Sequence, residues 1–229
     1  MSALHPVRLA HVSGEGDLSD SSSREHWEEV WAKADPDRVS WYESHPGISL
    51  RLIESSDMGP DAGVIDVGGG AALLVRELLA AGFTDLTVLE ISDRGIQVGR
   101  DRLGPLASDV SWIRADVREL SPRRTWDLWH DRAVFHFLTE ADDRVAYRQT
   151  LMDALAPGGQ AVLATFGPGG PTRCSGLEVR RYSPESLSEE LGYGLKLEEW
   201  TVELHSTPSG GEQEFLYGRF RRVSEPGSP

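Results

Sequence analysis

The sequence predicts an α/β protein built on one doubly wound, mostly parallel sheet of seven strands that ends in an antiparallel hairpin. Three observations support this prediction. Short apolar runs alternate with amphipathic helical stretches from residue 63 to residue 191. A glycine run, Gly68 to Gly70, joins the first of these strands to its helix. Near the end of the chain, the turn-forming segment 206–211 joins two strands directly, which is typical of antiparallel neighbours.

The N-terminal part of the chain divides into a tail and a helical lid. Residues 1–23 have few spaced apolar residues and are expected to be disordered. A helix is expected to begin at Arg24, with Ser23 as its N-cap, and a second helix to span 47–56. The lid, residues 24–58, is expected either to brace the main domain or to close over a ligand.

Alternating strands and helices follow, and together with the lid they form one predicted domain, 24–223, with 224–229 as a tail. The expected strands are 63–67, 86–89, 110–114, 126–129, 160–165, 195–205 and 214–222. The expected helices are 72–81, 95–103, 142–155 and 184–191. Residues 167–171, rich in glycine and proline, are expected to form a flexible loop.

Composition limits the classes of partner. The 229-residue chain has a formal net charge of −14, which disfavours nucleic acid because such binding depends on Lys and Arg. No apolar run reaches the roughly 18 residues that span a bilayer, and no export signal is evident. We therefore expect no membrane partner and a cytoplasmic location. The single cysteine, Cys174, and the scattered histidines predict neither an intrachain disulfide nor a metal site.

The glycine run has the composition of a nucleotide cradle. Asp66 lies near the end of the first strand, and Gly68 and Gly70 allow the backbone to turn sharply and approach a ligand closely. The helix that follows offers free N–H groups at its start. An ordinary tight turn between a strand and a helix explains the same glycines, so the motif alone leaves both interpretations open.

Acidic residues lie at the carboxyl ends of the first three strands: Asp66, Glu90 and Asp116. In a doubly wound sheet these ends share one edge, where ligands bind. Glu90 lies about 20 residues beyond Gly70, where a carboxylate can accept hydrogen bonds from both hydroxyls of a ribose. The three acids therefore predict a ligand with an unphosphorylated ribose.

These residues resemble the class I S-adenosylmethionine-dependent methyltransferases. The resemblance covers about residues 24–223 and is strongest in Val64 to Gly70, Glu90, Asp116 and Ala156 to Gly159. It implies a Rossmann-like methyltransferase fold, S-adenosyl-L-methionine as cofactor, and methyl transfer to a small-molecule or protein acceptor. A narrower resemblance links four segments to bacterial methyltransferase-domain proteins of unassigned substrate: 41–43, 130–136, 173–177 and 205–208.

The resemblance implies a cofactor site at this edge of the sheet, with lid residues over it. Its expected members are Trp31, Trp41, Asp66, Gly68, Gly70, Glu90, Ile91, Asp116, Val117 and His130. Gly68 and Gly70 would face the methionine part, with His130 beside it. Glu90 would bind the ribose. Ile91 would cover the adenine face, and Asp116 and Val117 would contact the adenine edge.

Two residues after strand 126–129 are candidate general bases, because a hydroxyl, thiol or ammonium acceptor must lose a proton. They are His136 and Asp131, and a capping or packing role is the alternative for His136. Three arginines after the fifth strand, Arg173, Arg180 and Arg181, either bind an anionic group of the acceptor or are solvated.

The sequence departs from the family pattern at two places. Ala72 stands where the glycine motif often has its last glycine. No Asn/Asp-Pro-Pro-Tyr/Phe tetrad follows the fourth strand, which disfavours amino groups of nucleobases or glutamine as acceptors.

Two other functions also fit the pattern. A nicotinamide-dependent oxidoreductase shares the glycine turn and the acid after the second strand. A non-catalytic cofactor-binding protein would keep the site without the reaction. Asp66, Asp116 and the terminal hairpin favour the methyl donor over NAD. The acceptor atom, the need for a base and the oligomeric state stay open.

Overall fold

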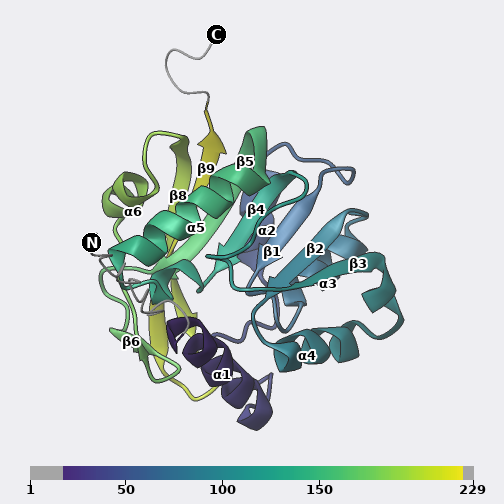
Figure 1. Cartoon of the computed structure of the whole chain (residues 1–229), viewed down its shortest axis with the longest axis vertical. Helices are drawn as coiled ribbons and strands as arrows, with labels where there is room; N and C mark the ends of the chain where they lie inside the picture. The colour runs from purple at the N-terminus through teal and green to yellow at the C-terminus, as the bar shows by residue number, and fades with distance from the viewer. Residues whose placement is uncertain (1–17, 224–229) are drawn as a thin grey trace, which may run out of the picture.

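The computed structural model describes residues 18–223, in which one sheet forms the middle layer (Figure 1). The seven strands of this sheet lie in the order β3-β2-β1-β4-β5-β9-β8. They are β1 (Val64–Val67), β2 (Leu86–Glu90), β3 (Val110–Arg114), β4 (Trp126–Arg132), β5 (Leu155–Phe166), β8 (Leu195–Ser206) and β9 (Glu212–Arg222). A separate two-stranded sheet pairs β6 (Arg173–Cys174) with β7 (Leu177–Glu178).

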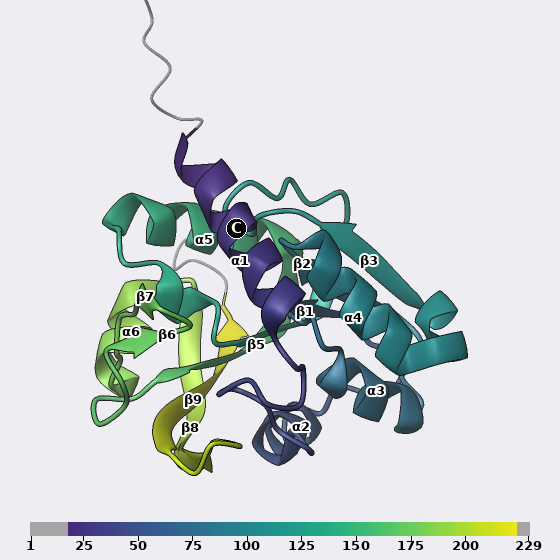
Figure 2. The same ribbon diagram turned by 90° about the horizontal axis from the view of Figure 1, so that it is seen from below.

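Helices cover both faces of the sheet (Figure 2). They are α1 (Leu18–Lys33), α2 (Gly47–Glu54), α3 (Leu73–Ala80), α4 (Asp93–Leu103), α5 (Ala141–Ala154) and α6 (Pro184–Leu191), with 3-10 turns η1 (Gly104–Asp109) and η2 (Phe135–Phe137). α2, α3 and α4 contribute to one buried apolar cluster, and α5 and α6 to the other. Within residues 18–223, no helix combines the length and apolarity needed to cross a membrane.

The pairing of the strands confirms the predicted fold class. β1 pairs in parallel with β2 and β4, and the parallel part extends to β3 on one side and β5 on the other. β9 runs antiparallel to both β5 and β8. β1 and β2 are buried along their whole length, as expected for parallel strands covered on both faces.

Three predicted boundaries are wrong by three residues or more. β5 begins at Leu155, five residues before its predicted start, so residues 157–159 belong to the strand. The first helix begins at Leu18 rather than at Arg24, so Ser23 lies inside α1 and is not its N-cap. The remainder of the predicted disordered tail, residues 1–17, and the C-terminal tail, 224–229, lie outside the described residues. β4 extends to Arg132, three residues beyond its predicted end, so it includes polar residues that the pattern placed after the strand.

The segment after β5 is more ordered than its composition predicts. In the expected flexible loop 167–171, the Gly169 N–H donates to the Glu214 carboxylate at 2.7 Å. The Arg181 guanidinium donates to two backbone carbonyls of the same loop. The β6 and β7 strands then meet through Ser175 and Gly176, whose φ angles of 50° and 81° are typical of a tight two-residue hairpin turn.

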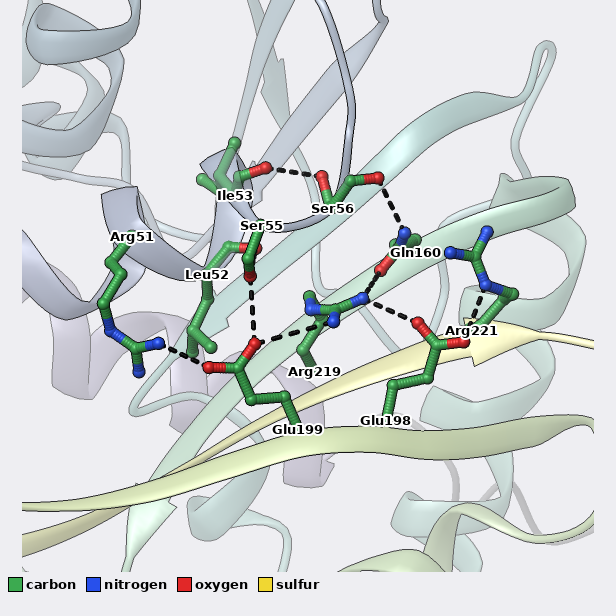
Figure 3. Close-up of polar contacts among 10 residues, drawn as sticks. All are labelled: Arg51, Leu52, Ile53, Ser55, Ser56, Gln160, Glu198, Glu199, Arg219 and Arg221. Atoms are coloured by element: carbon green, nitrogen blue, oxygen red, sulfur yellow. Dashed lines mark hydrogen bonds and ion pairs between the residues drawn. The ribbon is translucent and has the colours of Figure 1, made fainter.

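A polar network holds α2 against the sheet (Figure 3). Arg219 of β9 donates to Gln160 of β5 at 2.5 Å and to Glu198 of β8 at 2.6 Å. Gln160 donates to the carbonyl oxygen of Ser56, just beyond α2, at 2.9 Å. Glu199 completes the network by accepting hydrogen bonds from Arg51 and Ser55. α2 and the residues just after it are therefore joined to β5 by a buried contact and to β8 by exposed ones, and Arg219 of β9 binds the same partners.

Candidate functional site

A pocket lies at the carboxyl edge of the parallel strands, beneath α1. Its floor comes from the ends of β1, β2 and β4 and from the residues after β3. Its walls come from α1, the loop after α1, η2 and the β6–β7 hairpin. The space inside measures about 1040 Å³, including its opening to solvent. This is the location where doubly wound sheets bind nucleotides.

Glu90 lies at the carboxyl end of β2 and lines the pocket. Its side chain is buried, and its Oε1 accepts a hydrogen bond from the Ser92 N–H at 3.0 Å. Burial raises the pKa of Glu90 to about 7. The hydrogen bonds that the carboxylate accepts from backbone N–H groups lower the pKa, but burial has the larger effect. Gly70 leaves room for this carboxylate, because a Cβ at that position would lie 2.8 Å from its Oε2.

The opposite end of the floor carries a second carboxylate that is already paired. Asp116 accepts hydrogen bonds from the Arg118 Nε at 3.0 Å and its NH2 group at 2.6 Å. Arg118 also donates to Asp143 at the start of α5 at 2.8 Å. Ile91 and Val117 line the same part of the pocket. This end therefore combines apolar contacts with fixed polar groups, and Arg118 and Asp143 are site residues that the sequence pattern did not reveal.

Gly68 provides the turn at the end of β1. Its φ of +67° lies in the left-handed region, and a Cβ there would collide with the Val134 side chain, so only glycine fits without rearrangement. Ala72, at the last glycine position of the motif, also has a left-handed φ, +54°. An alanine therefore adopts here the backbone conformation for which glycine is usually needed.

Asp66 and His130 form a buried pair beside the glycine turn, outside the lining of the pocket. The Asp66 carboxylate lies 2.7 Å from the His130 Nδ1, and the His130 Nε2 lies 2.9 Å from the Ser49 hydroxyl on α2. The chain Asp66–His130–Ser49 thus links β1, β4 and α2. Both residues support the turn in this structure, and their predicted contact with the cofactor stays a prediction.

α1 is held over the floor by aromatic and polar contacts. Trp31 is buried against Gly70, where a Cβ would lie 2.8 Å from its ring. The Glu28 carboxylate accepts the N–H groups of Asp93, at 2.5 Å, and of Arg94, at 3.3 Å. A carboxylate at the N-terminus of α4 satisfies free backbone donors and the helix dipole together. The predicted lid residue Trp31 therefore sits above the glycine turn.

The far end of the pocket is aromatic. Trp27 meets Trp41 and Phe137 edge to face, with ring centroids 6.0 Å and 5.2 Å apart. Cys174 and Leu177 of the β6–β7 hairpin complete this wall. We refer to these five residues as the aromatic end.

Arg132, the last residue of β4, lines the pocket next to the aromatic end. Its Nε donates to the Tyr217 hydroxyl at 2.9 Å, and its NH1 group donates to the Trp41 carbonyl oxygen at 2.8 Å. Its NH2 group forms an ion pair with Glu43 at 3.1 Å. His205 of β8 reaches the same loop, with its Nε2 3.0 Å from the Ser40 carbonyl oxygen. The four segments of the narrower resemblance therefore converge around this end of the pocket.

Comparisons with known proteins agree with this geometry. Residues 64–159 match the family described as "Methyltransferase domain". Nodulation protein S of Sinorhizobium fredii (strain NBRC 101917 / NGR234) is 28% identical over 161 residues, which cover 69% of this chain and 73% of the relative. Nodulation protein S of Rhizobium tropici is 30% identical over 123 residues, 54% of this chain and 50% of the relative.

Solved structures of methyltransferases share the fold. N-methyltransferase NodS from Bradyrhizobium japonicum WM9, in complex with S-adenosyl-L-homocysteine, aligns with a TM-score of 0.65 at 19% identity, over 88% of this chain and 99% of that one. A protein studied for conversion of a disulfide bond into a thioacetal group during echinomycin biosynthesis aligns with a TM-score of 0.73 at 20% identity, over 90% and 94%.

The matched family, the relatives and the shared fold together support a class I S-adenosylmethionine-dependent methyltransferase. The predicted family, cofactor and enzyme class are therefore confirmed, and neither the oxidoreductase nor the non-catalytic alternative is supported.

The two predicted bases of this methyltransferase, Asp131 and His136, are fully buried and do not line the pocket. Asp131 accepts hydrogen bonds from the Tyr147 hydroxyl at 2.6 Å and the Val134 N–H at 2.9 Å, and burial raises its pKa to about 6. The His136 Nδ1 accepts the Phe166 N–H at 3.2 Å, and burial lowers the pKa of His136 to about 3, so the ring is neutral. The geometry favours structural roles for both residues, and neither enters the proposal below as a base.

The three arginines after β5 also lie away from the lining of the methyltransferase pocket. Arg173 donates to the Gly176 carbonyl oxygen at 2.6 Å. Arg180 forms an ion pair with Glu190 at 3.3 Å. Arg181 binds loop carbonyls, as described above. Their contacts hold the segment between β5 and α6 together.

One group in the described part of the methyltransferase has the spacing of metal ligands: Glu43, Glu203 and His205, whose donor atoms lie within 4.8 Å of one another. These side chains already form hydrogen bonds or ion pairs with other protein groups. The Tyr217 hydroxyl lies 3.3 Å from Glu43 and 3.0 Å from Glu203. With Arg132 also bound to Glu43, the cluster is explained by internal charge balance.

Proposed function

We propose that the enzyme methylates a small-molecule acceptor that binds in the aromatic end of the pocket. The observation that carries this proposal is that the aromatic end is walled on several sides by α1, the loop after it, η2 and the β6–β7 hairpin. A small molecule fits within these walls, whereas a protein side chain must enter between them on a flexible segment.

The residues of the floor fit S-adenosyl-L-methionine. The buried Glu90 carboxylate is suited to accept hydrogen bonds from the two ribose hydroxyls, since its ionised form needs such donors to offset burial. Ile91 and Val117 provide an apolar slot for the adenine ring. At the end of β1, Gly68 lets the backbone approach the methionine part without a side chain in the way.

The cofactor supplies a methyl group activated on a sulfonium, and its departure leaves a neutral thioether. The main task of the protein is therefore to align the acceptor atom behind the methyl group. Trp27, Trp41 and Phe137 can fix the orientation of an acceptor through apolar and ring contacts, and they exclude water from the site. We propose that α1 and the loop after it form the part of the predicted lid that covers the ligands.

The names of the relatives support an amine as the first class of acceptor to test. NodS of Bradyrhizobium japonicum is named an N-methyltransferase. The structure with the higher TM-score concerns chemistry at sulfur instead. The acceptor screen therefore needs both amines and thiols.

The test uses S-adenosylmethionine labelled on its methyl group, incubated with the full-length enzyme and a cell extract that has been separated into small molecules and proteins. Label is expected in the small-molecule fraction, and a Phe137→Ala variant should reduce its incorporation at unchanged cofactor affinity, measured by titration. Label that appears only in protein would contradict the small-molecule proposal and leave the methyltransferase assignment standing.

A further inference from the structure

β8 is an edge strand of the large sheet, and it carries an exposed apolar stripe. Trp200, Val202 and Leu204 alternate along the strand and are 54%, 47% and 59% exposed. Edge strands present unpaired backbone groups, and natural proteins usually protect them with charges, bulges or a covering element. In β8 the only register shift lies earlier, between Leu197 and Glu199. The segment 199–206 therefore continues as regular strand with its apolar stripe uncovered.

The stripe lies on the face of the sheet that α5 and α6 cover elsewhere. Val202 pairs with Leu216 of β9, and paired residues of antiparallel strands point to the same face. Leu216 is fully buried in the cluster of α5 and α6, whereas Val202 is half exposed. The helical layer thus ends between β9 and β8.

We propose that a second copy of the chain pairs with β8, antiparallel and centred on Val202, so that the two sheets join across a twofold axis. In this register Val202 lies opposite its own copy, and Trp200 lies opposite Leu204 of the other copy. Three apolar residues from each chain then form one continuous stripe. Such a self-complementary arrangement is what a twofold interface requires.

Charge selects this register over its neighbours. With Val202 at the centre, Glu199 lies opposite His205 and Thr201 opposite Glu203, so no two like charges face each other. Centring on Thr201 places Glu199 opposite Glu203, and centring on Glu203 places that residue opposite itself. Centring on Trp200 avoids like charges but sets Val202 opposite Glu198. Only the register about Val202 pairs the whole stripe with apolar residues.

A cysteine at the axis tests the register directly. Residues directly opposite in antiparallel strands have Cα atoms about 4.5–5.5 Å apart, within the range of a disulfide. Val202→Cys should therefore form a covalent dimer under mild oxidation, whereas Lys196→Cys, far from the axis, should not. The native Cys174 is buried, so the unmodified chain provides the background signal.

Sedimentation equilibrium of the full-length enzyme tests the interface itself. The wild type should show a concentration-dependent mass up to twice the 25.2 kDa of the single chain. Trp200→Glu should keep the mass at that of one chain, while Val145→Glu, at an equally exposed apolar position on α5, should leave dimerisation unchanged. Far-UV circular dichroism and thermal unfolding establish that both variants are folded.

Three results would overturn the proposal. The first is a wild type that stays a single chain at every concentration. The second is a dimer that Trp200→Glu leaves intact. The third is a Val202→Cys variant that cross-links no better than Lys196→Cys.

Discussion

The guanidinium of Arg132 lies 3.1 Å from the carboxylate of Glu43, and this ion pair joins β4 to the loop that follows α1. Both side chains are nearly buried, with exposed fractions of 10% and 12%. The carboxylate therefore balances a cation that water cannot reach. Because Arg132 also binds the Trp41 carbonyl oxygen, the pair fixes the backbone that carries one wall of the aromatic end.

We expect Glu43→Gln to lower the free energy of unfolding by roughly 3 kcal/mol, because removing one partner leaves a buried charge uncompensated. Urea unfolding at pH 7 measures this change. The matched control is Glu54→Gln, an exposed position on α2, which should change stability by less than about 0.5 kcal/mol. Equal effects in the two variants would show that the pair contributes no more than a surface charge.

Cofactor affinity should depend on pH through Glu90. Burial raises the pKa of this carboxyl to about 7, so in the free enzyme it is largely protonated at pH 6 and ionised at pH 8. Ribose hydroxyls bind the ionised form, so affinity for S-adenosylmethionine should fall roughly tenfold from pH 8 to pH 6. Isothermal titration calorimetry in buffers of different ionisation enthalpy measures both the affinity and the proton release.

In Glu90→Gln the affinity at pH 8 should fall by about 1.5–3 kcal/mol, and the dependence on pH should disappear. The control Glu189→Gln, on the exposed side of α6, should behave as the wild type. A rise in pH should strengthen cofactor binding but lower the stability of the free enzyme. Because the folded pKa is raised, the unfolded chain loses its proton first, and the free enzyme should lose stability as pH rises from about 4.5 to 7. Wild-type affinity that is flat from pH 6 to pH 8 would contradict this role of Glu90.

The floor of the site could be predicted from the sequence because it depends on local order along the chain. The apolar runs mark where the strands end, which places Glu90 and Asp116 at one edge, and the glycines mark the turn between the first strand and its helix. Each of these signals is local in the sequence. The structure adds a detail at Gly68: a side chain there meets Val134, so a Gly68→Val variant would disturb the fold as well as the cofactor site.

The walls of the pocket could not be predicted in this way, because they depend on contacts between distant segments. The ion pair of Arg132 joins residues that are far apart in the sequence, and no local pattern marks it. The polar end of β4 looks like a loop from the sequence alone, since Asp131 is acceptable in a buried strand only because Tyr147 and backbone N–H groups bind it. The strands β6 and β7 are too short for periodicity to detect.

The contact between Glu28 and α4 should control how firmly α1 covers the site. Glu28→Gln removes the charge that faces the N-terminus of α4, an interaction of about 0.3–1 kcal/mol, so cofactor affinity should fall by up to about fivefold. Trypsin should also cleave faster at Arg38, in the exposed loop after α1. The neighbouring Glu29→Gln is the control, because Glu29 is exposed and pairs with Lys33 on the same helix. Similar behaviour of both variants would mean that α1 is held by its tryptophans alone.

Arg219 should affect stability without affecting the cofactor, because its network (Figure 3) holds the C-terminal part of α2 through residues that do not line the pocket. Arg219→Met leaves Glu198, Glu199 and Gln160 without their shared donor and should lower the free energy of unfolding by about 3 kcal/mol. Arg221→Met provides the control: Arg221 is 40% exposed and pairs with the same Glu198, so its loss should cost much less than the loss of Arg219. Urea unfolding measures both variants, and titration with S-adenosylmethionine should give unchanged affinity in each. A tenfold loss of affinity in folded Arg219→Met would show that α2 moves together with α1 as one lid, whereas unchanged affinity identifies α2 as a fixed brace and leaves α1 and its loop as the covering segment.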